Sequence, residues 1–202
     1  MYSLPEGIPP YFLLLRKVFL CATIAALYII WCGFSPYHRK DPHKMLNRKA
    51  LKLEAKKLVA GSWGNISVKV DNEVLITPSG LGYENLQPKD LVLLDLDGNV
   101  LKGRHVPSSE SKLHTAIYAA CPEAGAIIHT HSIYASALAA MHKPVPAIIE
   151  DLVQIIGDRA QCAQYALPGT QELADNAVKA LQGKKACLLA NHGAVAWGKT
   201  LA

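Results

Sequence analysis

The sequence predicts a mixed α/β domain over residues 41–202, preceded by an apolar and basic segment at residues 1–40. Strand-like runs alternate with helical patterns, and two-residue hairpin turns join the first strands. The 202 residues are 50% hydrophobic and 18% charged, a composition that excludes a disordered chain and suffices for one sizeable domain. Because hairpins join antiparallel strands, a purely parallel, doubly wound sheet is not expected.

The N-terminal segment is mostly apolar over residues 11–34, interrupted by Arg16 and Lys17. Residues 18–34 carry no charge, and this run is at the lower edge of the length that a membrane-spanning helix needs. Two interpretations stay open: a membrane or interfacial anchor, or a mis-called start that replaces a normal amino terminus. Basic residues flank the run on both sides, so they predict no orientation.

A helix is predicted from residue 42, because Asp41 can cap its first turn and Pro42 favours the first helical position. Apolar residues recur at helical spacing and predict an amphipathic, largely solvated helix on the domain surface. The residues of this face are Leu51, Ala55, Leu58 and Val59.

Two hairpins follow, 66–70 with 73–77 and 91–96 with 99–102, around the turns Asp71-Asn72 and Asp97-Gly98. A helix is predicted at 108–121, with Leu113, Ala116, Ile117 and Ala120 on one face. The remaining elements are a buried strand at 126–129, helices at 132–141 and 170–181, and a last apolar strand at 186–190.

The formal net charge of +5 is concentrated near the N-terminus, where the first 60 residues carry ten Lys or Arg and three acids. The rest of the chain is slightly acidic, which argues against nucleic-acid binding. Five cysteines without a C-x-x-C pair argue against a disulfide scaffold or a thiolate zinc site. Reduced thiols in a cytoplasmic protein are the expected reading.

His129 and His131 end a predicted strand at positions i and i+2, so both side chains project to the same side and can share one ion. His192 follows another strand, and Glu110 enters a helix; three imidazoles with a carboxylate form a zinc-like ligand set. Taken singly, the histidines also fit hydrogen-bonded core or surface positions, and Glu110 fits an acid in the first turn of a helix.

Two loops, 61–65 and 77–80, combine glycines with hydroxyl groups, and Ser108 and Ser109 lie at a predicted helix N-terminus. Converging backbone N–H groups and a helix dipole favour a phosphate. Each feature alone also fits a tight turn or a helix cap.

The ordered motifs GNIS at 64–67, TPSG at 77–80, SSE at 108–110, HTH at 129–131 and NHG at 191–193 resemble the class II aldolase/adducin family from about residue 44 onward. The resemblance implies a three-layer α/β/α sandwich with a mostly antiparallel sheet, and a homotetramer with sites near subunit interfaces. It also implies zinc-dependent cleavage of a ketose 1-phosphate, a sugar phosphate, to dihydroxyacetone phosphate and an aldehyde.

By the same resemblance, Zn²⁺ is held by Glu110, His129, His131 and His192, and Glu110 is also catalytic, as a proton shuttle. The phosphate pocket consists of Asn65, Ser79, Gly80, Ser108 and Ser109. A glutamate at position 110 fits the aldolase branch better than the epimerase branch, in which the resemblance implies an aspartate at this position.

Two departures from the family pattern leave alternatives open. The chain looks truncated at its C-terminus, and the family's interface tyrosine falls at about residues 149–151. Glu150 is therefore either a replacement acid/base donated across an interface or a salt-bridging surface residue. A zinc-dependent decarboxylase or epimerase of sugar phosphates, and a non-catalytic adducin-like module, remain the alternatives.

Overall fold

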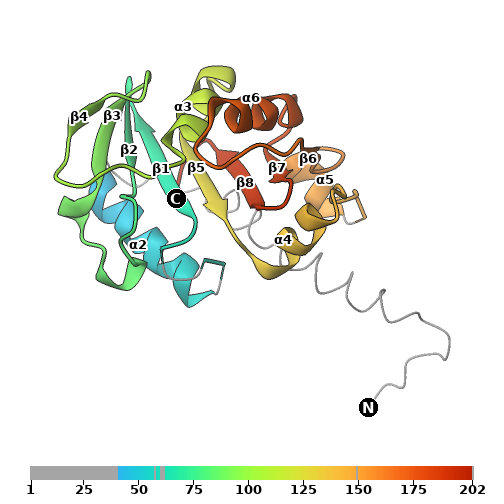
Figure 1. Cartoon of the computed structure of the whole chain (residues 1–202), viewed down its shortest axis with the longest axis horizontal. Helices are drawn as coiled ribbons and strands as arrows, with labels where there is room; N and C mark the ends of the chain where they lie inside the picture. The colour runs from blue at the N-terminus through green and yellow to red at the C-terminus, as the bar shows by residue number, and fades with distance from the viewer. Residues whose placement is uncertain (1–40, 57, 60–61, 149, 202) are drawn as a thin grey trace, which may run out of the picture.

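The computed structural model describes residues 41–56, 58–59, 62–148 and 150–201, and its strands form one eight-stranded sheet (Figure 1). The strands are β1 Asn65–Val70, β2 Glu73–Ile76, β3 Val92–Asp95, β4 Val100–Lys102, β5 Ala126–Thr130, β6 Cys162–Ala163, β7 Ala186–Leu189 and β8 Gly193–Gly198. Their spatial order is β4-β3-β2-β1-β5-β8-β7-β6. Every pairing is antiparallel except β6 with β7, so the sheet is mixed but mostly antiparallel.

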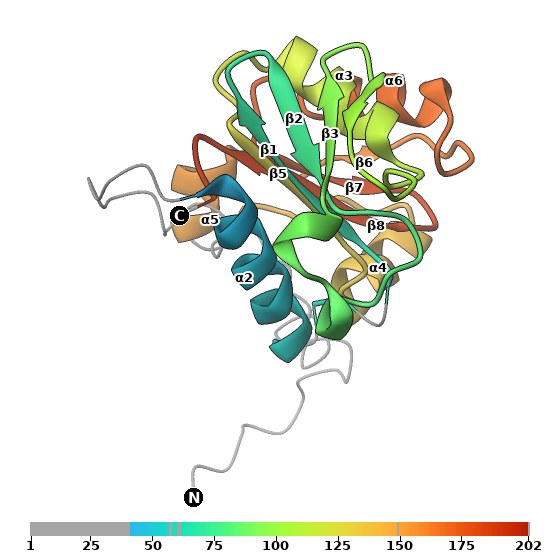
Figure 2. The same ribbon diagram turned by 90° about the vertical axis from the view of Figure 1, so that its left-hand side faces the viewer.

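Helices cover both faces of the sheet, as Figures 1 and 2 show. The helices are α2 Pro42–Ala55, α3 Ser111–Ala120, α4 Ile133–Ala140, α5 Glu150–Ile156 and α6 Gln171–Ala180, with 3-10 turns at Tyr83–Asn85 and Pro88–Asp90. One face carries α3 and α6, and the other carries α2, α4 and α5. The three-layer α/β/α sandwich is therefore confirmed.

Two hydrophobic cores lie on opposite sides of the sheet because strand side chains alternate. In β2, Val74 and Ile76 join the core that includes Ile117 of α3, whereas Leu75 joins the core that includes Leu46 of α2. The sheet is thus buried on both faces over its centre.

Both predicted hairpins are confirmed. The turn between β1 and β2 holds Asp71 at φ 55°, and the turn between β3 and β4 holds Gly98 at φ 89°. These residue types tolerate the left-handed conformation, which explains why the turns form at these positions.

The first helix begins as predicted, with the Asp41 side chain accepting a hydrogen bond of 3.0 Å from the His43 N–H. Its predicted face is wrong, because Leu51 and Ala55 are exposed. The buried stripe is instead Leu46, Lys49, Ala50 and Leu53. Since α2 ends at Ala55, Leu58 and Val59 are buried from the segment that follows rather than from the helix.

The helix predicted at 108–121 begins later, at Ser111, with Glu110 as its N-cap residue. Leu113 and Ile117 are buried as predicted, whereas Ala120 is exposed. Ser108 and Ser109 therefore lie in the loop that leads into α3, and not in its first turn.

Among the α-helices and strands of the described residues, α5, β6 and β8 are not predicted by the sequence. The first two are very short, with 7 and 2 residues. The third, β8, begins at Gly193 and lies inside the sheet between β5 and β7. The strand at 186–190 is consequently not the last.

The predicted apolar run at 11–34 lies outside the described residues. Within the described part of the chain, no helix combines the length and the hydropathy needed to cross a bilayer.

Candidate metal centre

The first two predicted ligands lie where β5 ends. His129 is completely buried, and its Nδ1 lies 3.0 Å from the Ala194 carbonyl oxygen on β8. A carbonyl can only accept, so Nδ1 carries the proton and the unprotonated Nε2 of the neutral ring faces the site. The half-buried His131 directs its own Nε2 to within 2.7 Å of this atom.

The third histidine, His192, lies in the turn between β7 and β8. The next residue, Gly193, packs so closely on β5 that a Cβ there would stand 2.3 Å from the Thr130 carbonyl oxygen. Glycine thus allows β8 to approach the end of β5, and the His192 ring centroid lies 4.7 Å from those of His129 and His131.

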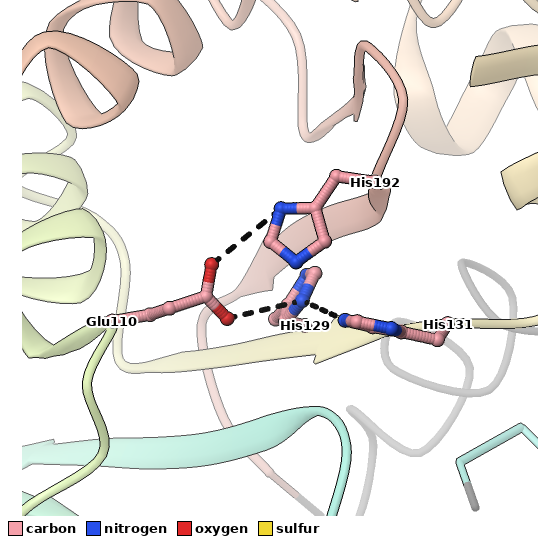
Figure 3. A group of neighbouring side chains, drawn as sticks. All are labelled: Glu110, His129, His131 and His192. Atoms are coloured by element: carbon pink, nitrogen blue, oxygen red, sulfur yellow. Dashed lines mark hydrogen bonds and ion pairs between the residues drawn. The ribbon is translucent and has the colours of Figure 1, made fainter. Parts of the chain in front are cut away.

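Glu110 completes the cluster from the other side of the site, at the start of α3 (Figure 3). Its Oε2 lies 3.1 Å from His129 Nε2, and its Oε1 lies 3.7 Å from His192 Nδ1. One ligand atom from each of Glu110, His129, His131 and His192 falls within 4.8 Å of the others. The structure therefore brings together all four residues predicted to hold a metal.

The chemistry of the cluster fits a divalent cation. Glu110 Oε1 and His192 Nδ1 are buried, and neither has a hydrogen-bond partner among the described residues. Burial lowers the pKa values of His129, His131 and His192, so these rings are neutral near pH 7 and present lone pairs. Neutral imidazoles and one carboxylate are ligands that suit Zn²⁺.

A cavity of about 340 Å³ opens beside the cluster. Its walls include Asn65, Ser79, Gly80, Ser108, Ser109, Glu110, His131 and His192. All five residues predicted to bind phosphate thus share one cavity with the candidate metal centre. Glu150, an exposed residue at the start of α5, is not among the lining residues.

Backbone contacts hold the hydroxyl-bearing loops together. The Ser79 N–H donates to the Val106 carbonyl at 2.9 Å, and the Ser108 N–H donates to the Thr77 carbonyl at 3.1 Å. Gly80, at φ 73°, turns the first loop at the edge of the cavity. Two segments far apart in the sequence therefore present their serines to the same space.

The cavity also contains residues that were not singled out as site residues: Ser62, Trp63, Gly64, Pro78 and Pro168. Trp63 is 65% exposed, and its ring centroid lies 5.8 Å from that of His131. The glycines of the loop 61–65, which favour an anion site, are the sequence signal that points to Trp63. Pro168 carries no local signal, since only the fold brings it here.

Residues 46–202 match the class II aldolase and adducin N-terminal domain, and the chain belongs to this family.

Two curated relatives are a 5-methylthioribulose-1-phosphate/5-deoxyribulose-1-phosphate aldolase of Rhodospirillum rubrum and an L-fuculose phosphate aldolase of Escherichia coli. The first is 42% identical over 70% of this chain, and the second is 38% identical over 67%. This chain spans 63% of the length of each of these relatives.

Solved structures show the same fold. An L-fuculose 1-phosphate aldolase superposes with a TM-score of 0.77 at 38% identity, covering 83% of this chain and 80% of that one. The enzyme of the same name from Thermus thermophilus gives a TM-score of 0.69 at 28% identity, with 79% and 80% covered.

Proposed function

We propose that this protein is a zinc-dependent lyase that cleaves a ketose 1-phosphate into dihydroxyacetone phosphate and an aldehyde. The observation that carries the proposal is the convergence of three histidines and one glutamate beside a cavity that five phosphate-binding candidates line. The names of two similar proteins support it, because they describe aldolases of ketose 1-phosphates.

In this proposal the phosphate lies against the serine loops. Ser79, Ser108 and Ser109 offer hydroxyl donors, Gly80 leaves its backbone open to a ligand, and Asn65 offers an amide. Ser109 also precedes the N-terminus of α3, where the helix dipole favours an anion. Binding the phosphate here would place the sugar's carbonyl end beside the histidines.

His129, His131, His192 and Glu110 would hold the metal. A bound Zn²⁺ supplies Lewis-acid stabilisation of the negative charge that develops on the carbonyl oxygen when the carbon–carbon bond breaks. Once the substrate displaces its carboxylate from the metal, Glu110 would take up a proton from solvent and deliver it to the carbon atom left with the electron pair of that bond. Its Oε1 atom is suited to this task, since it has no hydrogen-bond partner among the described residues.

The proton of the cleaved sugar's hydroxyl group needs a second acceptor. We propose that the catalytic domain begins at residue 41 and assembles as a homotetramer. In this assembly Glu150 of a neighbouring copy would accept the hydroxyl proton. Exposed apolar residues near Glu150 support an interface there, with Ile148 at 56% and Val153 at 42% exposure.

Free thiols at Cys121, Cys162 and Cys187 suit a reducing compartment, and we place the reaction in the cytoplasm.

The test is release of dihydroxyacetone phosphate by the 202-residue chain from L-fuculose, 5-deoxyribulose and 5-methylthioribulose 1-phosphates, with added zinc and with a chelator. Release that needs zinc supports the proposal and identifies the sugar. Release of CO₂ from 3-oxo sugar-acid phosphates, or epimerisation of a pentulose phosphate, would replace the aldolase reading. Stable protein with none of these activities would point to a non-catalytic module.

A further inference from the structure

A row of buried polar side chains extends from Glu110 into the layer between β1 and α3. Its members, here called the polar row, are Asn65, His114, Ser67 and Tyr118, with exposed fractions of 4, 0, 0 and 3%. Only Asn65 also lines the cavity. Buried polar groups destabilise a fold unless each is paired, so a continuous row of them next to a hydrophobic core requires an explanation.

The sequence spacing places these residues in register. Asn65 and Ser67 are at i and i+2 on β1, so their side chains project from the same face of the sheet. His114 and Tyr118 are at i and i+4 on α3, so they lie on the same face of the helix. The strand and the helix thus each contribute alternate members of one row.

Each neighbouring pair in the polar row is in hydrogen-bond contact. Asn65 Nδ2 donates to Glu110 Oε2 at 2.9 Å, and Asn65 Oδ1 contacts His114 Nε2. Ser67 Oγ lies 2.6 Å from His114 Nδ1 and 2.8 Å from the Tyr118 hydroxyl. The row therefore connects the carboxylate of a candidate metal ligand to the interior of the domain.

The direction of every hydrogen bond follows from the carboxylate at one end. An ionised Glu110 can only accept, so the Asn65 amide must direct its N–H₂ toward Glu110 and its oxygen toward His114. His114 then needs its proton on Nε2, and Nδ1 of the neutral ring accepts from the Ser67 hydroxyl. Ser67 in turn accepts from Tyr118, so each donor points toward Glu110.

The environment favours this arrangement of protons. Burial lowers the pKa of His114 to about 3, with a further contribution from His129, so the ring is neutral at physiological pH. Burial also raises the pKa of Tyr118, so its hydroxyl keeps the proton that it donates.

We propose that His114 is a positioning residue, which acts through Asn65 to hold the Glu110 carboxylate in the orientation that a metal ligand requires. The polar row holds Oε2, whereas Oε1 has no hydrogen-bond partner among the described residues and faces His192. This inference rests on the metal-binding role of Glu110 in the proposed function. Partners that orient a ligand from behind raise metal affinity by about 10- to 100-fold in other proteins.

The test compares His114→Gln, whose amide can still donate at the position of Nε2, with His114→Leu, which keeps the bulk but has no donor. Zn²⁺ affinity of the full chain is measured by competition with a chromophoric chelator. We expect a loss of about 10- to 100-fold for the leucine variant and near-wild-type affinity for the glutamine variant. Ile117→Val is the matched control, because Ile117 is equally buried on the same helix and lies outside the polar row.

Two spectroscopic measurements extend the test to the geometry itself. In ¹⁵N-edited spectra of the metal-free protein, His114 should show a neutral ring protonated on Nε2. The visible bands of the Co²⁺-substituted protein should change in His114→Leu and stay unchanged in Ile117→Val. Ser67→Ala keeps the contact between Asn65 and His114. For this variant we expect only small changes in the His114 ring signals, and smaller changes in the Co²⁺ bands than in His114→Leu.

The proposal is overturned if His114→Leu binds Zn²⁺ as the wild type does, if Ile117→Val loses as much affinity, or if His114 carries its proton on Nδ1. None of these measurements uses a sugar phosphate. An absence of aldolase activity therefore contradicts the proposed function alone, whereas unchanged metal binding in His114→Leu contradicts the polar row alone.

Discussion

The four candidate ligands differ in how firmly the chain holds them, and this decides which substitution is informative. His129 is buried and bonded to Ala194, whereas His131 is half-buried and donates to no backbone group that the structure records. Removing the His131 ring should therefore leave the fold intact. We expect His131→Ala to abolish stoichiometric zinc binding, as measured by metal analysis after gel filtration.

The matched control is His43→Ala, which removes a histidine from α2 instead. It should keep the full metal content. A His131→Ala protein that still carries one zinc per chain would show that the cluster is not the metal site.

Glu110 is the candidate for proton transfer, and its amide analogue tests this role. Glu110→Gln keeps the size of the side chain but cannot deliver a proton, so we expect the fold to remain and kcat to fall by about 100-fold or more. Steady-state kinetics and circular dichroism check the two parts. The exposed Glu123 provides a control, since Glu123→Gln should leave kcat unchanged; equal rates for both variants would remove Glu110 from the mechanism.

At the scale of elements, the loop before β1 is shaped by Gly64. This residue has φ +88°, and a Cβ would come within 2.7 Å of Val59 Cγ1 and 2.8 Å of the His129 carbonyl oxygen. Gly98 has nearly the same φ, +89°, but open space around it. Comparing alanine substitutions at the two glycines therefore separates the cost of backbone strain from the cost of steric conflict.

We expect Gly98→Ala to cost about 1 kcal/mol of unfolding free energy from backbone strain alone. Gly64→Ala should cost more, about 2 to 4 kcal/mol, and should weaken zinc binding because the loop presses against the strand of His129. Urea unfolding of the metal-free proteins measures both. Equal destabilisation would mean that the close approach of Gly64 to β5 does not matter.

At the scale of the whole molecule, buried neutral histidines make stability depend on pH. The pKa of His114 is about 3 in the fold, because burial disfavours its charged form, against about 6.5 in an unfolded chain. Between these values the unfolded chain binds a proton that the folded chain does not. The part of the unfolding free energy that depends on a neutral His114 is thus complete above pH 6.5 and is lost as the pH falls toward 3.

We expect the unfolding free energy of the metal-free protein to decrease below pH 6.5, by up to about 1.4 kcal/mol per pH unit for each such histidine. His129, whose pKa burial also lowers, adds to the slope. Urea titrations at several pH values measure it. His114→Gln removes one titrating group and should give a shallower slope; parallel curves would contradict the assignment.

The sequence by itself determined several local features and pointed to the residues that meet in the candidate metal centre. Turn chemistry at Asp71 and Gly98 determined the hairpins, and the Asp41 cap determined the start of α2. The i and i+2 spacing of His129 and His131 at the end of β5 placed two candidate ligands on one side. These features depend on neighbours a few residues apart, so the pattern of residues is sufficient to predict them.

Only the tertiary structure decided what depends on distant contacts. The buried face of α2, the central place of β8 and the position of Pro168 in the cavity all follow from packing between segments far apart in the chain. The same holds for His114, which carries no distinguishing signal within its predicted helix. Its role depends on contacts with Asn65 and Ser67 of β1, which only the fold brings to it. A buried hydrogen bond needs both members, and the sequence presents them 47 and 49 residues apart.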